Sequence, residues 1–133
     1  MYTEFIHDPD PILEQYLTNV RNTPPLSKEE KATLPRLLKE KDPHATVRMV
    51  DAHLADVLDL ISQYRARCEK ARSMLIPELI QEGNSGLIYA VKRFDWDHPE
   101  DFPDHMRNCV ELALDKAVQF AVSRRRTQPG ADK

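Results

Sequence analysis

The chain has 133 residues, of which 41% are hydrophobic and 31% are charged, and only 3 are glycines. This length suits one domain with a buried core, and the hydrophobic content excludes a wholly disordered chain. The net charge of −3 gives the chain as a whole no attraction to nucleic acid or to acidic membranes. No run of about 18 apolar residues occurs, and the first residues lack the pattern of a secretion signal. We therefore expect a soluble, cytoplasmic, helix-rich protein.

Two helices are predicted near the N-terminus. Asp10 is an N-cap acceptor that precedes a proline at the first helical position, so a helix is expected over residues 11–20. Pro24 and Pro25 prevent this helix from continuing. Ser27 and Glu30 then form the S-x-x-E capping box that begins a second helix, which Pro35 is expected to kink or shorten.

Three further helices follow. A second aspartate-proline pair and apolar residues at intervals of three and four predict one long helix over residues 43–64. A fourth helix is predicted over residues 76–94, a loop with two prolines over residues 95–104, and a fifth helix over residues 106–121. No strand pattern or internal repeat is found. The sequence therefore predicts an all-α, compact bundle of about five helices.

The chain divides into one domain and two terminal segments. Residues 1–9 are interpreted as an N-terminal extension, residues 10–122 as the helical domain, and residues 123–133 as a disordered tail with nothing to bury. Cys68 and Cys109 stand apart, without metal or disulfide spacing, and are expected to be reduced. Neither a metal nor a cofactor is expected.

The fourth helix has two distinct faces. Its apolar face collects Ile76, Leu79, Ile80, Gly83, Leu87, Ala90, Val91 and Phe94. The opposite face is polar but also carries Ile88 and Tyr89, which could anchor a partner, although isolated exposed apolar residues are common. Gly83 and Gly86 each cost about 1 kcal/mol relative to alanine inside a helix. A packing or functional reason must offset that cost.

Residues 79–95 read LIQEGNSGLIYAVKRFD, which closely resembles the second conserved region of housekeeping-type bacterial RNA polymerase sigma factors. Residues 10–17 and 25–30 resemble the first conserved region of that family and its connector. Residues 47–64, which include Asp-Ala-His-Leu, resemble the next helix of the family. The resemblance covers about residues 10–121 and implies the helical fold of sigma factor domain two.

In sigma factors this helix docks on the coiled coil of the polymerase clamp. The resemblance therefore implies that the protein binds the RNA polymerase core through Glu78, Gln81, Glu82, Asn84 and Ile88. The link between Tyr64 and Gln81 is longer than is usual in the family and lacks a glycine turn, so the third helix could extend through Arg72.

The promoter-melting residues of the family are mostly replaced. Sigma factors use a tyrosine, a phenylalanine and a pair of tryptophans to trap unpaired bases of the minus-ten element by stacking. The corresponding positions here are Glu100, Phe102, His105, Asn108 and Cys109. On the following turns, Leu112 and Asp115 stand where the family has polar residues that read bases, and Glu111 stands where it has a basic residue. Five carboxylates also lie within residues 95–104 without a lysine or arginine, and they would repel DNA.

These departures favour a sigma-like module that occupies the polymerase clamp and modulates initiation without reading promoters, so that DNA binding is weak or absent. The alternative is a divergent but genuine promoter-recognition factor, with Trp96, Phe102, Arg107 and the arginine-rich tail as DNA contacts. An enzyme with a metal site in the acidic loop is a distant third reading, because no catalytic or coordination motif is present.

Overall fold

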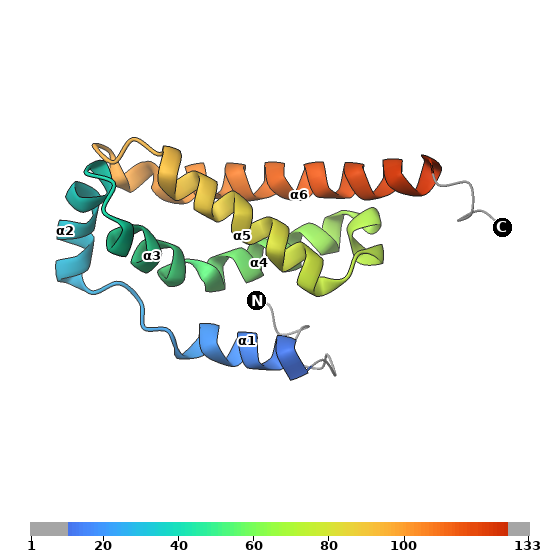
Figure 1. Ribbon diagram of the computed structural model, residues 1–133, viewed down its shortest axis with the longest axis horizontal. Helices are drawn as coiled ribbons and strands as arrows, with labels where there is room; N and C mark the ends of the chain where they lie inside the picture. The colour runs from blue at the N-terminus through green and yellow to red at the C-terminus, as the bar shows by residue number, and fades with distance from the viewer. Residues whose placement is uncertain (1–10, 128–133) are drawn as a thin grey trace.

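The computed structural model describes residues 11–127, and the side chains of residues 11–124. Within that range it is built from α-helices and two short 3-10 helices, with no β-strand, which confirms the all-α class (Figure 1). The elements are α1 (Pro11–Asn22), α2 (Lys28–Lys39), α3 (Pro43–Ala52), α4 (Leu54–Arg67), η2 (Glu69–Ser73), α5 (Ile76–Arg93), η3 (Pro99–Asp101) and α6 (Phe102–Thr127).

The start of α2 is set by the predicted capping box. The Glu30 N–H donates to Ser27 Oγ over 3.1 Å, and the Ser27 N–H donates to Glu30 Oε1 over 2.9 Å. Pro35 does not end α2, which continues to Lys39. The Arg48 guanidinium of α3 donates to both oxygens of Glu30, and this hydrogen bonding lowers the pKa of Glu30 to about 2. Arg48 also donates to the Pro24 and Pro25 carbonyls, each over 3.1 Å, which holds the α1–α2 connector against α3.

The predicted long helix over residues 43–64 is wrong in one respect, because the structure divides it into α3 and α4 at His53. His53 has φ −111° and ψ 6°, and its N–H bonds to the Val50 carbonyl, one residue short of the α-helical partner. Its ring Nδ1 lies 2.9 Å from the Met49 oxygen, and the ring packs edge-on against Phe102 at 5.2 Å. The side chain thus interrupts the backbone hydrogen-bond ladder, as polar side chains can.

The predicted extension of this helix through Arg72 is also wrong. The α4 helix ends at Arg67, and the chain turns back through η2. The Arg72 side chain donates from Nε to the Arg65 carbonyl over 2.9 Å and from Nη2 to the Ala66 carbonyl over 3.1 Å. Carbonyls of the last helical turn lack intrahelical partners, so these two bonds cap α4 and stabilise the turn.

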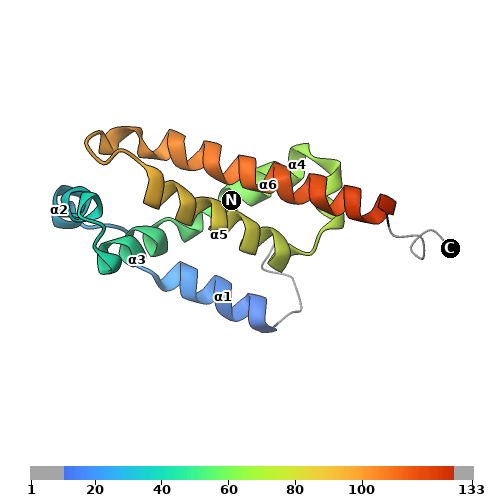
Figure 2. The same cartoon turned by 45° about the horizontal axis from the view of Figure 1, so that its top comes forward.

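The α5 and α6 helices run antiparallel, side by side, over α4 (Figures 1 and 2). Large fully buried side chains fill the space between them: Leu58, Ile61, Leu79, Leu87 and Leu114. A Cβ at Gly86 would lie 2.9 Å from the Cys109 oxygen and from the Val110 Cα of α6. A Cβ at Gly83 would lie 2.9 Å from a Val57 methyl group of α4. Close helix packing is therefore the reason that offsets the cost of both glycines.

The predicted loop over residues 95–104 is shorter than expected. It contains η3, and α6 begins at Phe102, because prolines are tolerated in the first turn of a helix. The α6 helix continues to Thr127, beyond the expected end at residue 121, so the segment predicted as a tail starts with helix. Residues 1–9 and 128–133 of the predicted extension and tail lie outside the described residues. No helix between residues 11 and 127 is long and apolar enough to cross a bilayer.

Candidate docking face on α5

The predicted apolar face of α5 is buried as expected. Leu79, Leu87 and Ala90 are fully buried, and the prediction that Ile88 and Tyr89 are exposed is confirmed, at 39% and 55%. With its apolar side anchored on α4 and α6, α5 holds its polar side chains at fixed positions toward the surface. Side chains on a packed helix can bind a partner with little ordering cost.

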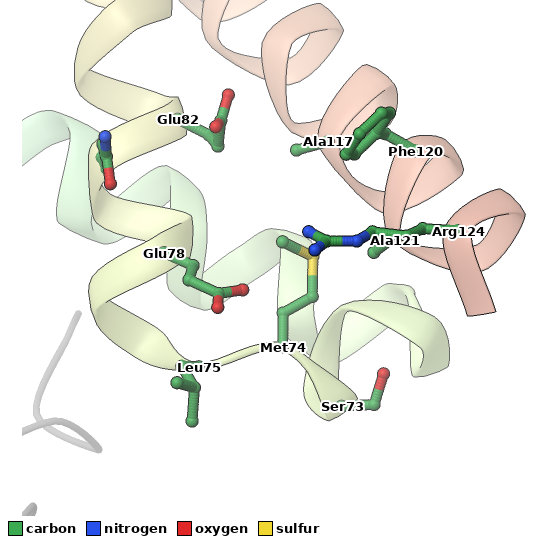
Figure 3. Close-up of a pocket in the computed structure, with 10 residues that line it drawn as sticks. Ser73, Met74, Leu75, Glu78, Glu82, Ala117, Phe120, Ala121 and Arg124 are labelled. Carbon is green, nitrogen blue, oxygen red and sulfur yellow. The ribbon is translucent and has the colours of Figure 1, made fainter. Parts of the chain in front are cut away.

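Three of the predicted polymerase-binding residues line one groove. Glu78 and Gln81 are exposed and Glu82 is half-buried, and all three line the groove between α5 and α6. Figure 3 shows Glu78 and Glu82 on the α5 side of this groove. The groove has a volume of about 500 Å³. Its other walls come from α6 and from the segment before α5: Ala117, Phe120, Ala121, Arg124, Ser73, Met74 and Leu75.

The carboxylates of this groove have no ion-pair partner within the described part of the chain. Glu78 and Glu82 lie one helical turn apart on α5, and neither forms a salt bridge with a described residue. Two acidic groups at this spacing present a negative edge that basic side chains of another molecule can reach.

The other two predicted residues, Asn84 and Ile88, do not line this groove. Asn84 Nδ2 donates to Tyr16 Oη over 3.0 Å, which ties α5 to α1, and Asn84 is half-buried by that contact. Ile88 follows one turn later on the same side of α5. The five residues are thus divided between the α6 side and the α1 side of α5, whereas the sequence predicted one continuous face.

The candidate DNA-contacting aromatics lie in the core. Trp96 is 6% exposed and Phe102 is 3% exposed, with their ring centroids 4.8 Å apart. Phe94 packs edge-on against both, and Trp96 Nε1 donates to the Val91 carbonyl over 3.0 Å. Neither ring offers a free face for a base to stack on. Arg107, by contrast, is exposed on α6.

Asp115 and Glu111 of α6, which stand where sigma factors have a base-reading and a basic residue, contact side chains of α4. The Tyr64 hydroxyl donates to Asp115 Oδ1, and burial together with this carboxylate raises the pKa of Tyr64. Arg67 Nη2 lies 3.2 Å from Glu111 Oε1. Both acidic side chains therefore join helices of the bundle.

Sequence reasoning did not identify the contribution of Leu75 and Phe120 to the groove. Both are large apolar residues with high exposure, at 66% and 68%. The available signal was that Phe120 falls off the apolar stripe of α6, which runs through Met106, Val110, Ala113, Ala117 and Ala121.

The described chain is thus a helical module with an acidic edge on α5 beside a surface groove, which makes this edge a candidate docking site. Within residues 11–127, no group of three or more histidine, cysteine, aspartate or glutamate side chains is placed to hold a metal ion. Comparisons with known proteins identify the family of this module.

The similar proteins are RNA polymerase sigma factors. The chain is 41% identical over 91 residues to RNA polymerase sigma factor RpoH of Caulobacter vibrioides, which is 68% of this chain and 29% of that protein. It is 33% identical over 109 residues to RNA polymerase sigma factor SigA of Clostridium acetobutylicum, covering 82% of this chain and 27% of that protein. A SigA from Bacillus sp. is 31% identical over 113 residues, or 85% of this chain and 28% of that protein.

This chain is therefore a homologue of bacterial RNA polymerase sigma factors over most of its own length. It spans less than a third of the length of these relatives. No protein-family model matches the chain.

Proposed function

We propose that this protein binds the clamp coiled coil of the RNA polymerase core through α5 and modulates transcription initiation without reading promoters. The proposal implies a cytoplasmic, non-enzymatic protein. The observation that carries it is that Glu78, Gln81 and Glu82 line a surface groove on the helix whose sequence most closely resembles sigma factors, with Glu78 and Gln81 exposed. Homology to sigma factors supports the polymerase as the partner.

The chemistry of the face suits a basic helical partner. Arginines of the clamp would donate charge-assisted hydrogen bonds to Glu78 and Glu82 and so set the orientation of the complex. Gln81 lies between these carboxylates and can both donate and accept. Ile88 adds apolar contact on the α1 side, while Asn84 contributes by fixing α1 against α5.

Replacing both Gln81 and Glu82 by alanine is expected to weaken binding to polymerase core about tenfold or more, because hydrogen bonds to a charged group contribute about 1.5–3 kcal/mol. Affinity is measured by fluorescence anisotropy of labelled protein titrated with core. The matched control is Ser85→Ala with Lys92→Ala, which changes two exposed α5 residues that do not line the groove. Unchanged affinity in the Gln81/Glu82 variant, with a native circular dichroism spectrum, would refute the assigned face.

The absence of promoter reading is supported by the buried aromatics and by the acidic segment before α6. Each aromatic–base stack contributes about 1–3 kcal/mol, and Trp96 and Phe102 could supply it only by leaving the core. Exposed carboxylates, among them Asp95, Glu100 and Asp101, would repel phosphates across about 8 Å at physiological salt. The alternative, a genuine promoter-recognition factor, is favoured by the homology itself and by the exposed Arg107.

We expect the protein, with or without polymerase core, to bind a labelled single-stranded minus-ten oligonucleotide no better than a scrambled one at physiological salt. In excess, it should nevertheless displace a housekeeping sigma factor from core, because the clamp-facing helix is retained. Anisotropy with both oligonucleotides measures the first expectation, and competition against labelled sigma factor measures the second. A preference for the minus-ten sequence that is lost in Arg107→Gln would establish the alternative. Arg107 is the suitable probe because its exposed side chain can be changed without disturbing the core.

A further inference from the structure

Two exposed apolar side chains lie in the same groove as the acidic edge of α5. Phe120 on α6 is 68% exposed and Leu75, just before α5, is 66% exposed. Both line the groove that contains Glu78 and Glu82. Leu112, also on α6 and 55% exposed, does not line it. Aromatic residues such as Phe120 are enriched at the centres of protein interfaces.

We infer that the docking surface spans two helices and that Phe120, with Leu75, is its apolar anchor. This inference rests on the function proposed above and adds α6 to it. Glu78 and Glu82 line the α5 side of the groove, and Phe120 lines the α6 side (Figure 3). Ala117 and Ala121 also line the α6 side, and their small side chains leave room beside Phe120. Met74 and Leu75 close the end nearest the start of α5.

The occupant is a basic helix of the polymerase clamp, and it is favoured by the charge of the α5 wall, where Glu78 and Glu82 lie, whereas Arg124 lies on the α6 wall. Glu78 and Glu82 are spaced one helical turn apart, so a partner helix with basic side chains at the same spacing pairs with both. Apolar side chains on the adjoining face of that helix would then lie over Phe120 and Leu75. An aromatic anchor beside a polar rim is the usual arrangement of residues that dominate binding energy.

The test compares Phe120→Ala with Leu112→Ala in the full chain. Both variants remove an exposed apolar side chain from α6, and only Phe120 lines the groove. Binding to polymerase core, and to the isolated clamp coiled coil as a peptide, is measured by anisotropy. Phe120→Ala should weaken both about tenfold, as truncation of an interface anchor does. Leu112→Ala should leave both unchanged, and neither variant should lower the melting temperature, since both side chains are exposed.

The possible failures are distinguishable. If the unmodified protein does not bind core, the proposed function fails and the inference with it. If the Gln81/Glu82 variant is weakened while Phe120→Ala binds normally, docking is confined to α5 and only the inference is overturned. If sedimentation velocity shows a dimer that Phe120→Ala dissociates, with polymerase affinity unchanged, the groove is a self-association surface and the inference is likewise overturned.

Discussion

Trp96→Ala is expected to lower the free energy of unfolding by about 3–5 kcal/mol, the usual cost of removing a buried large aromatic side chain. Trp96 is 6% exposed and packs against Phe94 and Phe102, each with a centroid distance of 4.8 Å. Its loss leaves a cavity in the loop between α5 and α6 and removes the hydrogen bond to the Val91 carbonyl. Urea denaturation followed by circular dichroism measures the change.

Trp96→Phe is the matched variant. It keeps an aromatic ring beside Phe94 but loses the indole N–H donor and part of the volume, so its loss of stability should be smaller than that of Trp96→Ala. A Trp96→Ala protein as stable as the unmodified one would contradict the structural role. That result would mean that packing does not need the Trp96 ring, which in the unmodified protein would then be available for DNA contact, as the promoter-reading alternative requires.

Gly86→Ala is expected to destabilise the protein by about 2 kcal/mol. Overpacking costs about 3 kcal/mol at a tight site, from which about 1 kcal/mol of improved helix propensity is recovered. The new Cβ would meet the Cys109 oxygen and the Val110 Cα, each at 2.9 Å, and backbone atoms cannot rotate away as a side chain can. Thermal and urea unfolding monitor the effect.

Gly83→Ala provides the comparison, with the same substitution on the same helix. Its Cβ would meet the Val57 methyl at 2.9 Å and the Ile61 Cδ1 at 3.2 Å, which are side-chain atoms that can shift more readily than the backbone of α6. The gain in helix propensity should offset most of the strain, so stability should change by less than in Gly86→Ala. Equal losses in the two variants would show that the α5–α6 backbone contact is not the tighter of the two.

The sequence by itself determined the features that depend on neighbours along the chain. The capping box of Ser27 and Glu30 is local chemistry, and the structure contains it. The buried and exposed faces of α5 follow from helical periodicity, since each position lies 100° from the last. The resemblance to sigma factors was likewise readable from residues 79–95, and homology over most of the chain confirms it.

Tertiary structure alone decided the features that depend on contacts between distant residues. His53 divides a continuous apolar pattern because its ring meets Phe102, some fifty residues later, as well as the Met49 carbonyl. Asn84 donates a hydrogen bond to Tyr16 of α1, a residue 68 positions earlier in the chain, so its side chain is engaged within the bundle. Periodicity assigns a side chain to a face of its own helix, but it does not say which other element covers that face. For the same reason the burial of Trp96, and the groove that joins Phe120 to the acidic edge of α5, emerged only from the packed bundle.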